Sequence, residues 1–310
     1  MSQAFQHRPV MVDEVVASLA AVPAGVLVDV TLGAGGHAGA LLDAHPQLRL
    51  LGIDRDEAAL AAAAENLARF GDRVIGLEHA RFDRITLIAQ RVALPVTAVL
   101  FDLGVSSPQL DHAERGFSYR LDAPLDMRMD RSTGRTAADV VNGTTEQELV
   151  RLIADSGERR FARRIARRIV ERRPLSTTVE LAEVVRDAIP AAARRTGGHP
   201  ARRVFQALRI AVNDELAVLG PAVDAALALL VPQGRCAVLA YHSGEDRIVK
   251  ERFAHAATGG CVCPPTLPCV CGARPTVRLL TRGARKPSPV EVAENRRSES
   301  ARLRVCERLE

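Results

Sequence analysis

Residues 26–37 read VLVDVTLGAGGH, in which an apolar run is followed by a turn containing three glycines. The run favours a buried β-strand and the turn favours the start of a helix. Residues 49–53 predict the next strand, which leads into Asp54. A glycine loop after one strand and an acid after the next suit an adenosine ligand, because the backbone can approach it and the carboxylate accepts hydrogen bonds from ribose hydroxyls. The stretch predicts an α/β fold with a ligand site at its strand ends.

Two later strands also lead into polar residues. Residues 102–111 read DLGVSSPQLD and residues 241–247 read YHSGEDR, each after an apolar run. Open parallel sheets bind ligands at the carboxyl ends of their strands. These segments predict one crevice lined by several strand ends, with candidate chemical groups on His242, Ser243 and Asp246. The alternative to a catalytic role is that His242 is a structural residue at the start of a helix.

Strands and helices alternate on both sides of the opening stretch, which is typical of a parallel sheet with helices on both faces. Before residue 103 we expect strands at 26–30, 49–53, 74–77 and 97–102, with helices at 36–44, 56–70 and 81–91. After residue 200 we expect a long helix ended by Gly220-Pro221, a strand at 235–241, a helix at 245–256, and strands near 276–281 and 302–306.

The middle of the chain favours helices alone. Thr145 with Glu148 and Thr177 with Glu180 have the spacing of capping boxes. We therefore predict three parts: 1–111 as the first part of the sheet domain, 112–200 as a helical substrate-recognition insertion, and 201–310 as the second part of the sheet domain.

Residues 158–173 predict a helix with one apolar stripe and an excess of arginine. The whole chain has a formal net charge of +5 and a sequence pI near 9.1. Arginine forms bidentate contacts with phosphate, so we expect nucleic-acid contacts from Arg163, Arg164 and Arg167. The alternative is a solvated helix face, but such faces normally mix charges of both signs.

Four cysteines lie within eleven residues, at positions 261, 263, 269 and 271. Clustered thiols suggest zinc, although two Cys-x-Cys pairs are less typical of zinc than Cys-x-x-Cys pairs. Reduced thiols in a hairpin are the alternative. The spacing leaves open whether Cys261, Cys263, Cys269 and Cys271 bind a metal.

Composition indicates an ordinary globular protein of 310 residues, with 47% hydrophobic and 25% charged residues. The sequence has neither a secretory leader pattern nor an apolar stretch long enough for a membrane span. Six cysteines in this length do not suggest a secreted disulfide scaffold. A cytoplasmic enzyme is the expectation, with no membrane partner and no indication of the oligomeric state.

Nine short blocks, in order, resemble the bacterial family of 16S ribosomal RNA cytosine-N4 methyltransferases of the small subunit. They are HRPV at 7–10, GGH at 35–37, IDRD at 53–56, DLGVSSPQ at 102–109, ERGF at 114–117, PLDMRMD at 124–130, HPA at 199–201, FQALRI at 205–210 and HSGEDR at 242–247. The resemblance implies a Rossmann-like class I S-adenosylmethionine-dependent methyltransferase that modifies N4 of cytosine 1402 in 16S rRNA. The sequence departs from the family pattern at Tyr241, where phenylalanine is usual, and at Gly244, where leucine is usual.

The family resemblance also implies residue roles. The cofactor contacts fall on Gly35, Gly36, His37, Asp54, Phe82, Asp102 and Gln109. The acceptor of the N4 proton is not identified, and the candidates are His242, Ser243 and Asp246. A nicotinamide-dependent dehydrogenase, which shares the glycine pattern, and a non-catalytic RNA-binding or ribosome assembly factor are the alternatives.

Overall fold

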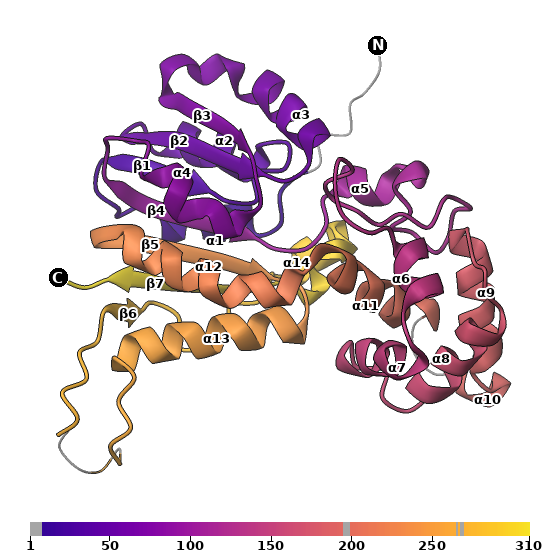
Figure 1. Ribbon diagram of the computed structural model, residues 1–310. Helices are drawn as coiled ribbons and strands as arrows, with labels where there is room; N and C mark the ends of the chain where they lie inside the picture. Colours follow the sequence, from indigo (N-terminus) through magenta and orange to yellow (C-terminus); the bar gives the residue numbers. More distant parts are fainter. Residues whose placement is uncertain (1–7, 195–198, 265, 267–269) are drawn as a thin grey trace. The chain divides into compact units, whose positions relative to one another are not determined.

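The computed structural model describes residues 8–194, 199–264, 266 and 270–310 (Figure 1). The chain divides into two compact units. The sheet unit combines the residues up to Gly104 with Leu216–Glu310, and the helical unit is Val105–Glu215. The helical unit extends beyond the expected 112–200 at both ends. The carboxyl-terminal boundary lies beyond residue 200 because α11 (Ala201–Asn213) packs against other helices of this unit rather than against the sheet.

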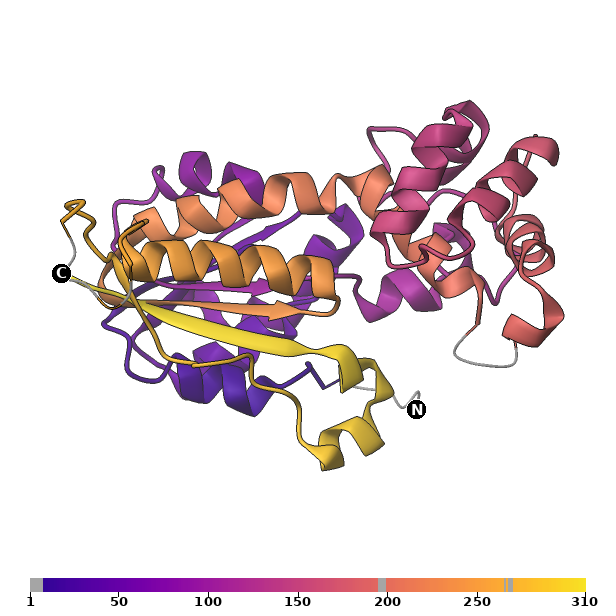
Figure 2. The same ribbon diagram turned by 90° about the horizontal axis from the view of Figure 1, so that it is seen from below.

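The sheet unit contains seven strands in the order β3-β2-β1-β4-β5-β7-β6. The first five strands are parallel, whereas β7 runs antiparallel to β5 and to β6 (Figure 2). The strand bounds are β1 Gly25–Asp29, β2 Leu48–Asp54, β3 Val74–His79, β4 Val96–Asp102, β5 Leu230–Ala240, β6 Val277–Leu279 and β7 Arg302–Arg308. The predicted Rossmann-like parallel sheet is confirmed.

Apolar residues bury both faces of this sheet. Along β1, Val26 and Val28 belong to one apolar cluster and Leu27 to another, because successive side chains point to opposite faces. The helices of the unit are α1 Val12–Ser18, α2 Gly36–Ala44, α3 Glu57–Leu67, α4 Ile85–Ala89, α12 Glu215–Leu229, α13 Ser243–Thr258 and α14 Pro289–Glu294, with 3₁₀ turns at Ala68–Arg73, Phe82–Arg84 and Arg296–Ser300.

The helical unit has an apolar core of its own, which includes Leu149, Ile165, Ile169 and Phe205. Its helices are α5 Ser107–Asp111, α6 Ala137–Gly143, α7 Glu146–Asp155, α8 Ala162–Glu171, α9 Thr178–Ala188, α10 Ala191–Arg194 and α11, with a 3₁₀ turn at Ala113–Arg115. Both predicted capping boxes are confirmed at α7 and α9. A third capping box, which we did not predict, begins α6 at Thr136 with Asp139.

The prediction that Gly220-Pro221 end a long helix is wrong. The helix instead breaks at Asp214, whose φ of 51° is left-handed, and α12 continues through Pro221. Leu219, Ala222 and Val223 around the proline are buried against the sheet. Their burial offsets the roughly 3 kcal/mol that an interior proline costs a helix. No helix within the described ranges combines the length and apolar character of a membrane span.

Candidate cofactor site and nucleic-acid interface

Three acids lie at the carboxyl ends of adjacent parallel strands. Asp29 ends β1, Asp54 ends β2 and Asp102 ends β4. Because these strands are parallel and neighbouring, the three carboxylates lie along one edge of the sheet. Together with His37 and Tyr241, which contact them, we call these residues the carboxyl edge.

Asp54 holds the glycine loop in place. Its Oδ2 accepts a hydrogen bond from the Gly33 N–H at 2.7 Å, and its Oδ1 accepts one from the Asp56 N–H at 2.8 Å. Each carboxylate oxygen has a second lone pair, so the group can also accept hydrogen bonds from a vicinal diol. The carboxylate therefore fits a ribose while it orders the loop beside it.

The two glycines at the start of α2 allow close packing. Gly35 has a left-handed φ of 81°, and a Cβ there would lie 2.8 Å from Leu67 Cδ1. A Cβ on Gly36 would lie 2.7 Å from Pro9 Cγ. Larger residues would force α2 away from its neighbours and move the loop.

Asp102 is held by two side chains. The Tyr241 hydroxyl donates to Asp102 Oδ1 at 2.7 Å, and His37 Nδ1 lies 3.3 Å from Asp102 Oδ2. His37 Nε2 is 2.9 Å from the Val10 carbonyl oxygen. Both partners of the imidazole are acceptors, so the protonated ring satisfies both. The arrangement fixes Asp102 and joins the amino-terminal segment to the edge.

Burial shifts the pKa values of this edge. Desolvation raises the pKa of Asp29 from 3.8 to about 7, although nearby His37 opposes the rise. Burial also raises the pKa of Asp54, against the hydrogen bonds from Asp56 and Gly33. Burial alone would lower the pKa of His37, but the Asp102 carboxylate, the Val10 carbonyl and Asp29 together outweigh it and the net shift is upward. Burial, and secondarily Asp102, raises the pKa of Tyr241 well above its ordinary value.

Two predicted cofactor residues lie elsewhere. Phe82 begins the 3₁₀ turn after β3, where its half-buried ring meets Phe101 edge-on with centroids 6.0 Å apart. Gln109 belongs to the helical unit, where it is buried in α5 and accepts a hydrogen bond from the Ser106 N–H. Thus Gly35, Gly36, His37, Asp54, Phe82 and Asp102 share the sheet unit, whereas Gln109 comes from the other unit.

The three proton-acceptor candidates lie at the start of α13. His242 is its N-cap, and its Nδ1 accepts from the N–H groups of Gly244 and Glu245. The proton of the neutral ring therefore resides on Nε2. This atom is buried 3.1 Å from Glu245 Oε1, outside hydrogen-bond geometry. Ser243 is exposed, and Asp246 forms two hydrogen bonds with Arg304.

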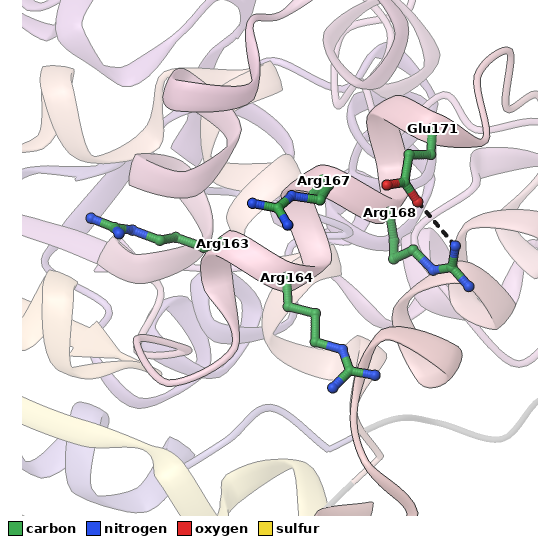
Figure 3. Close-up of a pocket in the computed structure, with 5 residues that line it drawn as sticks. All are labelled: Arg163, Arg164, Arg167, Arg168 and Glu171. Carbon is green, nitrogen blue, oxygen red and sulfur yellow. Dashed lines mark hydrogen bonds and ion pairs between the residues drawn. The ribbon is translucent and has the colours of Figure 1, made fainter.

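The predicted nucleic-acid residues lie on one helix. Arg163, Arg164, Arg167 and Arg168 are exposed on α8, and we call them the arginine face. With Glu171 they line a pocket. Figure 3 shows that the guanidinium groups of Arg163 and Arg164 point in different directions. Arg168 pairs with Glu171 at 2.9 Å, and Arg167 lies 3.9 Å from Glu146. Within the described ranges, Arg163 and Arg164 form no ion pair within 4 Å.

Sequence reasoning missed Tyr241 and Asp29 as site residues. Both carried a usable signal, because Asp29 interrupts the apolar run of its strand and Tyr241 adds a hydroxyl where the family usually has phenylalanine. The partnership between Tyr241 and Asp102 joins residues 139 positions apart, so local pattern could not show it.

The strand order, the glycine loop and the acids at the strand ends are those of a Rossmann-like domain with an adenosine site, as expected for an S-adenosylmethionine-dependent methyltransferase. The chain belongs to the MraW methylase family, whose family model matches residues 4–309. This match favours a methyltransferase over both alternatives considered from the sequence.

Curated relatives agree over almost the whole chain. The ribosomal RNA small subunit methyltransferase H of Thermobifida fusca is 54% identical over 99% of this chain and 94% of its own length. The protein of the same name from Heliobacterium modesticaldum is 50% identical over 98% of this chain and 99% of its own length. An rRNA methylase of known structure from Streptococcus thermophilus is 12% identical, with a TM-score of 0.42 over 96% of this chain and 94% of that one.

Proposed function

We propose that this protein transfers a methyl group from S-adenosylmethionine to N4 of cytosine 1402 in 16S rRNA of the small ribosomal subunit. The observation that carries the proposal is the match at 50–54% identity, over nearly the full chain, to relatives named ribosomal RNA small subunit methyltransferase H. Such a reaction takes place in the cytoplasm, where the subunit is assembled.

In this proposal the carboxyl edge binds the cofactor. Asp54 accepts hydrogen bonds from the ribose hydroxyls, and the Phe82 ring contacts the adenine. Gly35 and Gly36 let the backbone approach the ligand. Asp102, fixed by Tyr241 and His37, completes the contacts of the sheet unit. The bound cofactor supplies an activated methyl group, so the chain needs no nucleophile of its own.

The difficult partner is the cytosine amine, whose lone pair is delocalised into the ring. The contribution of the protein is to hold N4 in line with the methyl group, and orientation of this kind supplies roughly 7–11 kcal/mol in favourable cases. The developing charge makes the N4 proton strongly acidic, so a modest acceptor suffices. Of the candidates, the exposed Ser243 and Asp246 with its arginine partner remain available as acceptors.

The geometry of His242 favours a donor over a base. Its Nδ1 already accepts two backbone hydrogen bonds, so Nε2 carries the proton, and this atom lies buried 3.1 Å from Glu245 Oε1. In this proposal, binding of the base opens the surroundings of Nε2–H, which then donates to the carbonyl oxygen or ring nitrogen of the cytosine. We therefore assign His242 a positioning contact with the base in addition to its cap.

Two substitutions separate the roles of His242. His242→Asn keeps a side-chain oxygen that caps α13, whereas His242→Ala loses the cap and costs about 1 kcal/mol of stability. If Nε2–H positions the base, both variants lose turnover, and the Asn variant does so with a near-normal melting temperature. Normal turnover of the Asn variant would restrict His242 to the cap.

The arginine face supplies phosphate contacts in this proposal. Enzymes that modify a base act on single-stranded or extruded nucleotides, so the flanking backbone must be held while the base is presented. Each exposed guanidinium group can form a bidentate contact with a phosphate, and the side chains on α8 point in different directions, which suits several phosphates of one backbone (Figure 3).

The decisive experiment is methyl transfer from tritiated S-adenosylmethionine to small subunits taken from a strain that lacks this enzyme. Nucleoside analysis should identify the label as N4-methylcytidine, and mapping of labelled RNA fragments should place it at position 1402. Cofactor binding without label in any RNA would favour the RNA-binding alternative, and label at another nucleotide would overturn the assigned substrate. Naked 16S rRNA, tested in parallel, shows whether the assembled subunit is required.

A further inference from the structure

Outside the carboxyl edge, three thiols gather in the segment between α13 and β6. The Sγ atoms of Cys261, Cys263 and Cys271 all lie within 4.8 Å of one another. Cys269, the fourth cysteine of the sequence cluster, lies outside the described residues. The described cysteines are thiols rather than disulfides.

The base of this segment is fixed by its backbone. Gly259 ends α13 in a left-handed conformation, and a Cβ there would lie 2.4 Å from the Arg274 carbonyl. The Thr276 N–H donates to the Ala256 carbonyl at 2.9 Å. The segment 256–259 is therefore held beside the segment 274–276. Cys261 comes shortly after the first of these segments, and Cys271 comes shortly before the second.

Beyond this base the described part of the segment has little apolar packing. Val262 and Val270, which alternate with the cysteines, are 87% and 88% exposed. A connection longer than about 15 residues without secondary structure is uncommon in a compact domain. Hydrophobic burial therefore contributes little to the convergence of the thiols.

The separation of two of the sulfurs matches a tetrahedral metal site rather than a disulfide. Cys261 Sγ and Cys271 Sγ are 3.7 Å apart. A tetrahedral zinc ion with Zn–S bonds of about 2.3 Å places its sulfurs about 3.8 Å apart, whereas a disulfide requires about 2.05 Å. The Val270 N–H also donates to Cys263 Sγ at 3.4 Å, a contact that favours the thiolate form a metal requires.

We propose that Cys261, Cys263 and Cys271 bind a structural zinc ion that closes the segment between α13 and β6. Thiolate donors select zinc over hard cations such as magnesium. The thiols release their protons to solvent when the ion binds. The carboxyl edge lies at the start of α13, and this helix of 16 residues is about 24 Å long. The zinc ion therefore stabilises the fold and takes no part in methyl transfer.

The test measures metal content of the full chain, purified under reducing conditions without chelator. Mass spectrometry of the metal should find about one zinc ion per chain, and Cys263→Ser and Cys271→Ser should each lose most of it. Val262→Ser in the same segment and Cys236→Ala, which removes a thiol buried in β5, should retain it. Replacement by cobalt should give the sulfur-to-metal charge-transfer bands of a thiolate site.

A second readout does not depend on the variants. Removal of zinc by a chelator should increase hydrogen exchange in residues 259–276 and leave S-adenosylmethionine affinity unchanged. Less than a tenth of an ion per chain after incubation with zinc and reductant would overturn the proposal. So would retention of zinc by the Cys263 and Cys271 variants, or a Cys261–Cys271 disulfide in the freshly isolated protein.

Discussion

The carboxyl edge and the arginine face place charge in opposite ways. At the edge, the partly buried Asp54 and Asp102 accept hydrogen bonds from defined partners. On α8, four arginines project into solvent and, among the residues that the structure describes, two of them have a carboxylate within 4 Å. A site with fixed hydrogen-bond partners, such as the carboxyl edge, recognises individual atoms of a ligand. A set of exposed charges, such as the arginine face, attracts a polyanion of variable shape.

The largest effect we expect tests the burial of the edge. The folded state raises the pKa of Asp29 from 3.8 to about 7, so it binds more protons than the unfolded state between these values. The contribution of Asp29 to stability is thus present below pH 3.8 and is lost as the pH rises through 7, by at most about 4 kcal/mol.

Asp29→Asn removes this titration. Denaturant unfolding at several pH values should show a smaller decline of stability with pH for this variant than for the wild type. Asp43→Asn, at an exposed acid paired with Arg69, is the control and should follow the wild type. Parallel curves for Asp29→Asn and the wild type would mean that Asp29 is already ionised in the folded protein.

The next effect concerns the ligand contacts of the edge. Asp54→Ala should weaken S-adenosylmethionine binding roughly 100-fold, because it removes two charge-assisted hydrogen bonds and releases the Gly33 loop. Calorimetry measures the affinity, with Asp43→Ala as the matched acid. A loss below threefold would show that the carboxylate orders the loop without touching the ligand.

The arginine face should respond in the other assay. Reversal of Arg163, Arg164 and Arg167 to glutamate should weaken RNA binding at least about 50-fold near 0.15 M salt and flatten its salt dependence by about two in the logarithmic slope. Cofactor affinity should not change, which separates the two regions.

The control for this variant has equal charge. Arg69, Arg91 and Arg252 are exposed arginines of the sheet unit that already pair with acids. Their reversal should reduce RNA affinity much less. If both triple variants lost RNA affinity equally, the arginine face would contribute to binding only through the net charge of the protein.

The sheet and the helix caps could be predicted because their signals are local. Asp56, at which the expected helix 56–70 begins, is the N-cap of α3, and Thr145 and Thr177 form their capping boxes with acids three residues away. Local signals failed at Pro221, where burial of neighbouring residues against the sheet overrides the helix-breaking tendency of the ring.

The candidate site could be predicted only in part, because its partners are distant in sequence. The acids at the strand ends followed from the alternating pattern, but the contacts of Asp102 with His37 and Tyr241 depend on the strand order. The role of His242 as a cap likewise depends on the rotamer that brings Nδ1 to the N–H groups of α13, and residue type alone does not determine a rotamer.

The smallest effect we expect comes from a single hydroxyl. Tyr241→Phe removes the hydrogen bond to Asp102 Oδ1 but leaves the ring and the His37 contact in place. Since one such bond contributes about 1 kcal/mol, cofactor affinity should fall about fivefold. Calorimetry measures the affinity, and Tyr119→Phe in the helical unit, where the ring stacks on His199, is the control. An unchanged affinity would mean that His37 alone orients Asp102, and the edge would then depend on fewer fixed contacts than the comparison with α8 assumes.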